Sequence, residues 1–251
     1  MEGKEGIGPR CIWLTRDGRC ANCKARRYRF DAIGMKERYG ECGDQGDHLI
    51  CVFYRPDLFR DGVAADRSTP RSMDLESMVV GLRSPDVFDC RAALEDTKEF
   101  LEAGWADRKL LLAILPLTSS EDLQVRRDAS WCLGKLALFK LGDPRSVDSL
   151  LMLTTDRDAG VRSNAAWALG ELAGMHIGDA ISIEALNILL TDDDREVRCI
   201  AAWALGRMAD KMRVTSPSSV SLLEAVLRDE SEYLRKGAAW SLERIHRLRP
   251  L

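Results

Sequence analysis

One short motif recurs four times in the C-terminal part of this 251-residue chain, at an almost constant interval. The copies begin 36, 36 and 37 residues apart and read VRRDASWCLGKLA from Val125, VRSNAAWALGELA from Val161, VRCIAAWALGRMA from Val197 and LRKGAAWSLERIH from Leu234. Self-similarity at such a period is typical of repeat proteins, in which each copy buries its apolar face against its neighbours. This feature constrains the fold more than any other in the sequence.

Each motif predicts a helix, because Ala, Leu, Arg and Glu dominate it and proline is absent from its interior. A shorter apolar segment precedes each motif, and these segments span Lys109–Leu117, Ser146–Leu153, Ile181–Leu190 and Val220–Leu227. Asp143 with Pro144, and Ser216 with Pro217, match an N-cap followed by proline at the first helical position. Each repeat is therefore predicted to be two helices joined by a tight turn. A weaker copy from Met73 to Ala103 brings the number of repeats to about five.

The motif Val-Arg-x-x-Ala-Ala-Trp-Ala-Leu-Gly-x-Leu, with Asp three residues before the Val, resembles the HEAT-like repeat of the phycobilisome-lyase type. The resemblance covers residues 105–250. It implies an all-α fold, a right-handed α-solenoid of helix-turn-helix repeats over residues 74–251, of the kind that serves as a binding surface in scaffolds, adaptors and chaperone-like lyases. Related deoxyhypusine hydroxylases need His-Glu iron-binding pairs. Because none of His48, His176 and His246 is followed by Glu, that activity is not expected.

The tryptophans of the motif occupy one position, on the side of the helix away from the apolar core stripe: Trp131, Trp167, Trp203 and Trp240. We predict that they line the concave face of the solenoid once per repeat, about 10 Å apart. Arg127 and Arg207 lie beside them, and Trp and Arg are enriched at binding hot spots. These six residues are therefore predicted to bind a protein partner. The competing interpretation is that each indole packs flat over neighbouring alanines.

An arginine follows the first residue of each motif, and the four are Arg126, Arg162, Arg198 and Arg235. Asp122, Asp158 and Asp194 precede the first three by four residues, whereas the last repeat has Ser231 at that place. The pattern predicts a ladder of Asp–Arg hydrogen bonds that joins adjacent repeats. The hydrogen bond of the last repeat is the weaker candidate. A site for a substrate anion is the alternative.

Residues 1–60 form a second region with different chemistry, separated from the repeats by a linker over residues 61–73. They hold 12 basic and 9 acidic residues, against 25 and 31 in the rest of the chain. Five of the eight cysteines also lie here, namely Cys11, Cys20, Cys23, Cys42 and Cys51. About sixty residues without a long apolar element need a further source of stability, which a bound metal can supply. We therefore predict a small, irregular, cysteine-rich metal-binding module.

Four thiolates suffice for either zinc or a [4Fe-4S] cluster, so one of the five cysteines is surplus. One possible set pairs Cys11 and Cys20 with Cys42 and Cys51 through the repeated x8 spacing. This set is also favoured by a resemblance of residues 11–56 to small four-cysteine modules of prokaryotic proteins. The other set uses the knuckle of Cys20 and Cys23 with two of the remaining cysteines. The three cysteines within the repeats, Cys90, Cys132 and Cys199, are predicted to be packing residues.

Composition and charge bear on which classes of function the chain can have. The net charge of −3 does not mark a dedicated nucleic-acid binder, and the longest apolar stretch is too short to cross a bilayer. The N-terminus lacks the apolar core of a signal peptide, which predicts a cytoplasmic protein. We expect a non-catalytic scaffold or adaptor that binds a protein partner. The alternatives are an iron–sulfur electron-transfer or cofactor-maturation accessory protein and a lyase-like chaperone for a prosthetic group.

Overall fold

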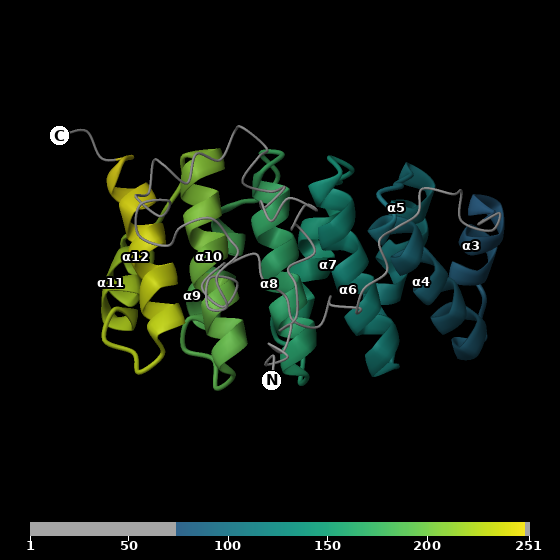
Figure 1. Ribbon diagram of the computed structural model, residues 1–251, viewed down its shortest axis with the longest axis horizontal. Coiled ribbons are helices and arrows are strands. Elements are labelled where there is room, and N and C mark those ends of the chain that lie inside the picture. The colour runs from purple at the N-terminus through teal and green to yellow at the C-terminus, as the bar shows by residue number, and fades with distance from the viewer. Residues whose placement is uncertain (1–73, 249–251) are drawn as a thin grey trace, which may run out of the picture. The chain divides into compact units, whose positions relative to one another are not determined.

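The computed structural model of this chain describes residues 74–248 (Figure 1). The predicted cysteine-rich module and the linker lie outside these residues. The described part consists of five consecutive helix pairs. They are α3 (Leu75–Leu82) with α4 (Val87–Glu102), α5 (Arg108–Ile114) and the 3-10 helix η4 (Leu115–Ser119) with α6 (Leu123–Leu138), α7 (Arg145–Leu153) with α8 (Ala159–Ala173), α9 (Ala180–Leu189) with α10 (Arg195–Met212), and α11 (Pro217–Val226) with α12 (Glu232–His246). The predicted all-α solenoid of five repeats is confirmed.

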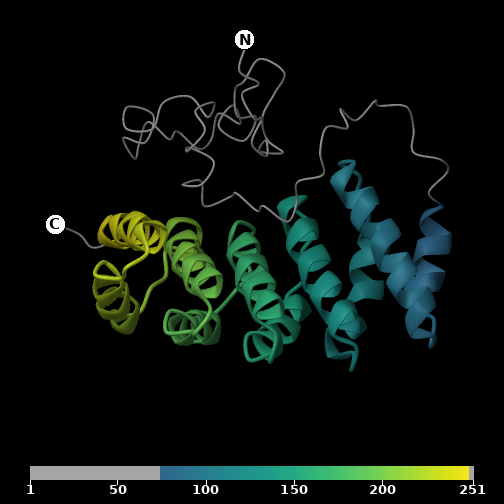
Figure 2. The same cartoon turned by 60° about the horizontal axis from the view of Figure 1, so that its bottom comes forward.

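The helices of the described part form two layers (Figure 2). Helices α6, α8, α10 and α12 lie side by side and each contacts the next, so we call them, with α4, the second-helix layer. Helices α7, α9 and α11 lie together on the other side and belong, with α3 and α5, to the first-helix layer. None of the helices from residue 74 to 248 is long and apolar enough to span a membrane.

Side-chain caps fix where the helices begin. Asp122, Asp158 and Asp194 each accept a hydrogen bond from the backbone N–H three residues on, at 3.0 to 3.1 Å. Ser216 caps α11 with Pro217 at its first position, as predicted. The helix predicted over Lys109–Leu117 changes to 3-10 geometry after Ile114. Pro116 explains the change, because it has no N–H for an α-helical hydrogen bond and clashes with the preceding turn.

The core lies between the layers and is built from the stripe that the motif predicts. Val125, Val161, Val197 and Leu234 are at most 1% exposed, and the alanines four residues after the first three are fully buried. Small side chains at this position let the paired helices approach closely. Each repeat therefore presents the same apolar stripe to the core, and the remaining faces of the second helices are left for contacts between repeats.

The tryptophan face of the second helices

The motif tryptophans pack across repeats. A Cβ atom added at Gly170 would lie 2.5 Å from Cζ3 of Trp203, closer than real side chains approach. The same obstruction is found between Gly134 and Trp167 and between Gly206 and Trp240. Each of these rings therefore lies against the helix of the preceding repeat, at a position where a larger side chain would force the ring or the helix to shift. The competing interpretation placed each indole over neighbouring alanines, whereas these three rings lie on a glycine of the preceding repeat.

The four indoles differ in exposure. Trp131 is 4% exposed and Trp203 is 1% exposed, whereas Trp167 and Trp240 are half-buried. The expected row of four exposed rings is therefore not present. Trp167 and Trp240 keep part of their surface accessible.

A charged side chain follows each tryptophan by four residues. Lys135 lies 5.5 Å from the ring centroid of Trp131, Arg207 lies 5.4 Å from Trp203, and Arg244 lies 3.6 Å from Trp240. In the repeat that lacks a cation, Glu171 accepts a hydrogen bond from the side chain of Trp167. Cations above an aromatic ring are attracted by its negative face. The sequence carries this signal as a recurrent charge one helical turn after the tryptophan, and the predicted binding residues include one member of this set, Arg207.

Arg207 and Glu171 form a buried ion pair between neighbouring repeats. Nη2 of Arg207 lies 2.7 Å from Oε2 of Glu171, and Nε of Arg207 donates to the carbonyl of Gly170 at 3.3 Å. Burial raises the pKa of Glu171, although Arg207 and Lys140 act in the opposite direction. Burial also lowers the pKa of Lys135. The predicted partner-binding residue Arg207 is thus 4% exposed and engaged inside the solenoid.

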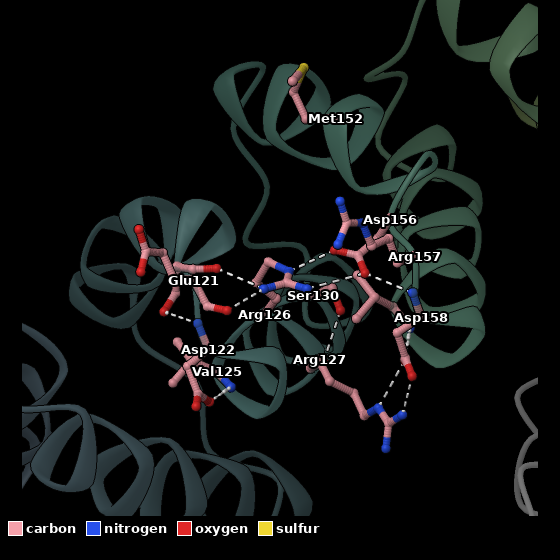
Figure 3. Close-up of polar contacts among 12 residues, drawn as sticks. Glu121, Asp122, Val125, Arg126, Arg127, Ser130, Met152, Asp156, Arg157 and Asp158 are labelled. Carbon is pink, nitrogen blue, oxygen red and sulfur yellow. Dashed lines mark hydrogen bonds and ion pairs between the residues drawn. The ribbon is translucent and has the colours of Figure 1, made fainter.

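Arg127 occupies a different environment. Its Nη2 atom lies 2.7 Å from Oδ2 of Asp158 in the next repeat, and its side chain is 41% exposed (Figure 3). Arg91 makes the equivalent contact with Asp122 one repeat earlier. An ion pair with this exposure contributes little stability, because water screens it. Arg127 therefore combines a structural contact with surface that a partner can reach.

The arginine ladder between repeats exists, but its acidic partners are not the predicted ones. Arg126 binds Asp156 with Nε to Oδ2 at 2.6 Å, and its Nη1 atom donates to the carbonyls of Ser120 and Glu121 (Figure 3). The same pattern joins Arg162 to Asp192 at 2.7 Å, whereas Arg198 is 3.7 Å from Asp229.

These acids lie two residues before the N-cap of the following repeat. The predicted acids Asp122, Asp158 and Asp194 cap their own helices instead, because the N-cap geometry aims their carboxylates at backbone N–H groups. Burial raises the pKa of Asp156, but the hydrogen bonds from Arg126 and from the backbone N–H of Asp158, together with the charge of Arg126, outweigh burial, so the net pKa lies below the usual value of 3.8. Arg126 and Arg162 are thus committed to joining repeats rather than open for a substrate anion.

The cysteines of the repeats behave as packing residues. Cys90 and Cys132 are buried and Cys199 is half-buried, and all three are free thiols. Burial raises the pKa of each thiol, for Cys199 to about 11. A thiol with a raised pKa is a poor nucleophile and a poor metal ligand at neutral pH. The five cysteines predicted to bind metal lie outside the described residues, so that site stays a prediction.

Comparisons with known proteins agree with this geometry. A family model of HEAT repeats matches residues 99–170 and 183–249, more than half of the chain. The crystal structures of two engineered proteins are similar to the chain, with TM-scores of 0.56 and 0.55 and identities of 26% and 25%. These alignments cover 68% of this chain and 78% and 80% of the engineered ones.

A third similar structure is that of computationally designed armadillo repeat proteins for modular peptide recognition. Its TM-score is 0.52 at 23% identity, over 68% of this chain and 82% of that one, and at this identity the likeness shows the fold alone. No curated protein matches the chain.

Proposed function

The chain belongs to the HEAT-repeat proteins, and from this premise we propose that it is a non-catalytic scaffold or adaptor that binds a protein partner on its second-helix layer. The observation that carries the proposal is the regular spacing of one tryptophan in each of the last four repeats, with a charged side chain one turn away. Aromatic and arginine side chains at such spacing suit an extended partner surface, because these residue types dominate binding hot spots.

The accessible part of this surface is smaller than the sequence suggests. Trp167 and Trp240 are half-buried and Arg127 keeps 41% of its side chain exposed, so these three are the candidate contacts with a partner. Trp131, Trp203 and Arg207 offer a partner almost no surface, since they are nearly fully buried. A partner would thus meet rigid aromatic groups whose positions are fixed by the glycines of the preceding repeats. Fixed groups lose little side-chain entropy on binding.

The binding test uses a pair of matched variants. The first carries Trp240→Ala and Arg127→Ala on the second-helix layer. The control carries Met152→Glu and Ile188→Glu, which replace exposed side chains on the first-helix layer. Affinity capture with the full chain and mass spectrometry identifies proteins retained by the wild type.

We expect the control to retain the same partner and the second-helix variant to lose at least tenfold in affinity, which corresponds to about 1.4 kcal/mol. Circular dichroism first checks that both variants keep wild-type helical content. Loss of the partner by the control alone, or equal retention by both variants, contradicts the proposal.

We further propose that the N-terminal region holds one metal site with four of its five cysteines, carrying either zinc or a [4Fe-4S] cluster. The support is the cysteine spacing. Metal analysis and visible absorbance of protein purified without oxygen test it. Stoichiometric zinc fits a structural module, whereas iron with sulfide and absorbance near 400 nm fits the electron-transfer or maturation alternative. Protein that contains neither metal contradicts the site.

A further inference from the structure

In each of α6, α8 and α10, one face of the helix packs against the second helix of the next repeat. The equivalent face of α12 points outward. In α6, α8 and α10 this face contains a small residue that is fully buried beneath the following helix: Ser130, Ala166 and Ala202. It also contains the glycines on which the next tryptophan packs. The corresponding residues of α12 are Ala239, which is exposed, and Glu243 in place of glycine. The face therefore has the shape of a helix-packing surface but carries charge.

The residues along this face are regularly spaced. They are Glu232, Lys236, Ala239, Glu243 and His246, with Arg247 beside the last. Their separations of 4, 3, 4 and 3 residues place them on one line along a helix, as in the seam of a coiled coil. The order of charge along the line is acidic, basic, neutral, acidic, basic. Along the chain the acid precedes the base on both sides of Ala239, so residues at similar distances before and after Ala239 have opposite charge character.

This order is self-complementary only when a second copy of the helix runs in the opposite direction. With a two-fold axis at Ala239, Lys236 faces Glu243 of the second copy, and Glu232 faces His246 and Arg247 of the second copy. A parallel pair in the same register would place like charges opposite each other. The small alanine at the axis lets the two helices approach closely. One patch can then serve both subunits, as a two-fold interface requires.

Within its own helix, each charged side chain already has an oppositely charged neighbour. Glu232 pairs with Lys236 at 2.6 Å, and Glu243 pairs with Arg247. These i, i+4 pairs hold the charges in line along the exposed face. In an antiparallel pair they would join into a four-member network across the two helices. Networks of this kind contribute more than isolated surface pairs.

Arg235 adds a second observation at the same end of the solenoid. Its Nη1 atom donates to the carbonyls of Asp229 and Glu230 at 2.6 and 2.8 Å, the same clamp that holds Arg126, Arg162 and Arg198. In those repeats the rest of the guanidinium points forward to an acid of the next repeat. The antiparallel arrangement places Glu243 of the second copy on the same side as Arg235.

A head-to-tail stack of copies does not offer this complement. The first repeat has Ser84 at the place where Asp156, Asp192 and Asp229 stand in later repeats, two residues before the N-cap. Arg235 would therefore meet a hydroxyl at the N-terminal end of another copy. At this position, therefore, Glu243 of a second α12 offers Arg235 an acid, whereas Ser84 does not.

We propose that the exposed face of α12 is a homodimer interface, formed by antiparallel pairing of two α12 helices about Ala239. It is separate from the partner-binding proposal, because it uses the end of the solenoid. A single helix pair buries less surface than a standard interface of about 1,600 Å². The dimer is therefore weak and exchanges in solution.

Sedimentation equilibrium of the full chain under reducing conditions, at roughly 1 to 100 µM, tests the proposal. The wild type populates a dimer in this range. Lys236→Glu and Glu243→Lys each weaken dimerisation at least tenfold, because each places like charges across the axis. The double variant exchanges both charges and recovers the affinity to within about threefold. Ala239→Arg also abolishes the dimer, since its bulk separates the helices.

Charge reversal of Glu224 on α11, written Glu224→Lys, is the matched control and leaves dimerisation unchanged. Circular dichroism confirms that every variant keeps the helical content of the wild type. A wild type that is monomeric at the highest concentration overturns the proposal. So does a dimer that tolerates Lys236→Glu, or a double variant that fails to recover, because either result shows that the charges of α12 do not meet across an axis.

Discussion

The junction between the first two repeats differs from the three that follow it. Between α6 and α8, α8 and α10, and α10 and α12, a tryptophan lies on a glycine of the preceding helix. Between α4 and α6 the glycine position holds Lys98, which pairs with the buried carboxylate of Asp128 at 3.0 Å. One kind of junction is an apolar contact of ring on backbone, and the other is a polar contact of side chain on side chain.

The junction between α4 and α6 also lacks both members of the arginine ladder. Cys90 stands where Arg126, Arg162 and Arg198 stand later, and Ser120 stands where their acids stand. An arginine left without its acid, or a buried acid without its arginine, would cost more than the absence of both. The comparison shows that each junction is a unit whose two sides must change together. The weak sequence match of the first repeat is therefore a change of junction chemistry within an unchanged helix pair.

The largest expected effect comes from removing a ring from an apolar junction. Trp203→Ala leaves a void above Gly170 in a fully packed region and should lower the free energy of unfolding by about 3 to 5 kcal/mol. Urea denaturation followed by circular dichroism measures the change. Trp203→Phe is the matched control, because it keeps a ring in place and should cost less. Loss below about 1 kcal/mol in Trp203→Ala contradicts the packing role.

The second effect tests the glycine side of the same junction. Gly170→Ala brings a Cβ within 2.5 Å of Trp203 and should cost about 1 to 3 kcal/mol, even though alanine favours helix formation. Gly237→Ala is the control, since no atom lies within 4 Å of an added Cβ there. That variant should gain about 0.5 to 1 kcal/mol. Equal shifts in the melting temperatures of the two variants would refute the proposed need for glycine.

The ladder gives a smaller effect with a distinct pH dependence. Asp156→Asn should cost about 1 to 2 kcal/mol at pH 7, because it removes a charged hydrogen bond with Arg126. The folded state lowers the pKa of Asp156, so the carboxylate contributes stability above its usual pKa of 3.8 and loses it as the pH falls below that value. Thermal melts at pH 7 and pH 3 measure the difference between variant and wild type. A stability difference between variant and wild type that grows on acidification contradicts the prediction.

The smallest effect is expected at the polar junction. Lys98→Met removes the ion pair with Asp128, and we expect a loss of about 0.5 to 1 kcal/mol, because the lysine is partly exposed and its stem still covers the helix. Asp128 keeps its hydrogen bond from Gln124 at 2.9 Å. Denaturation in low and high salt checks the result, since salt should reduce the contribution of this pair in the wild type. A loss larger than that of Gly170→Ala would reverse the comparison.

Much of the fold follows from the sequence because it depends on local rules. The 36-residue period and the start of α11 at Pro217 follow from residues close in the chain. The core stripe follows from the 3.6-residue helical period. The solenoid itself could be predicted because the repeats share the same pattern of two helices, a tight turn and an apolar stripe.

The partner of each side chain on the remaining faces was decided by the tertiary structure. Helical spacing places Arg126 near Asp122, yet stacking of the next repeat brings Asp156, 30 residues away, into range of its guanidinium. Likewise the ring of Trp203 lies on Gly170 of the previous repeat, a contact set by the axial offset of two helices. Periodicity within a helix carries no information on that offset. The sequence alone thus determined which residues share a face of each helix. Only the packing of one repeat on the next determined which residues each face contacts.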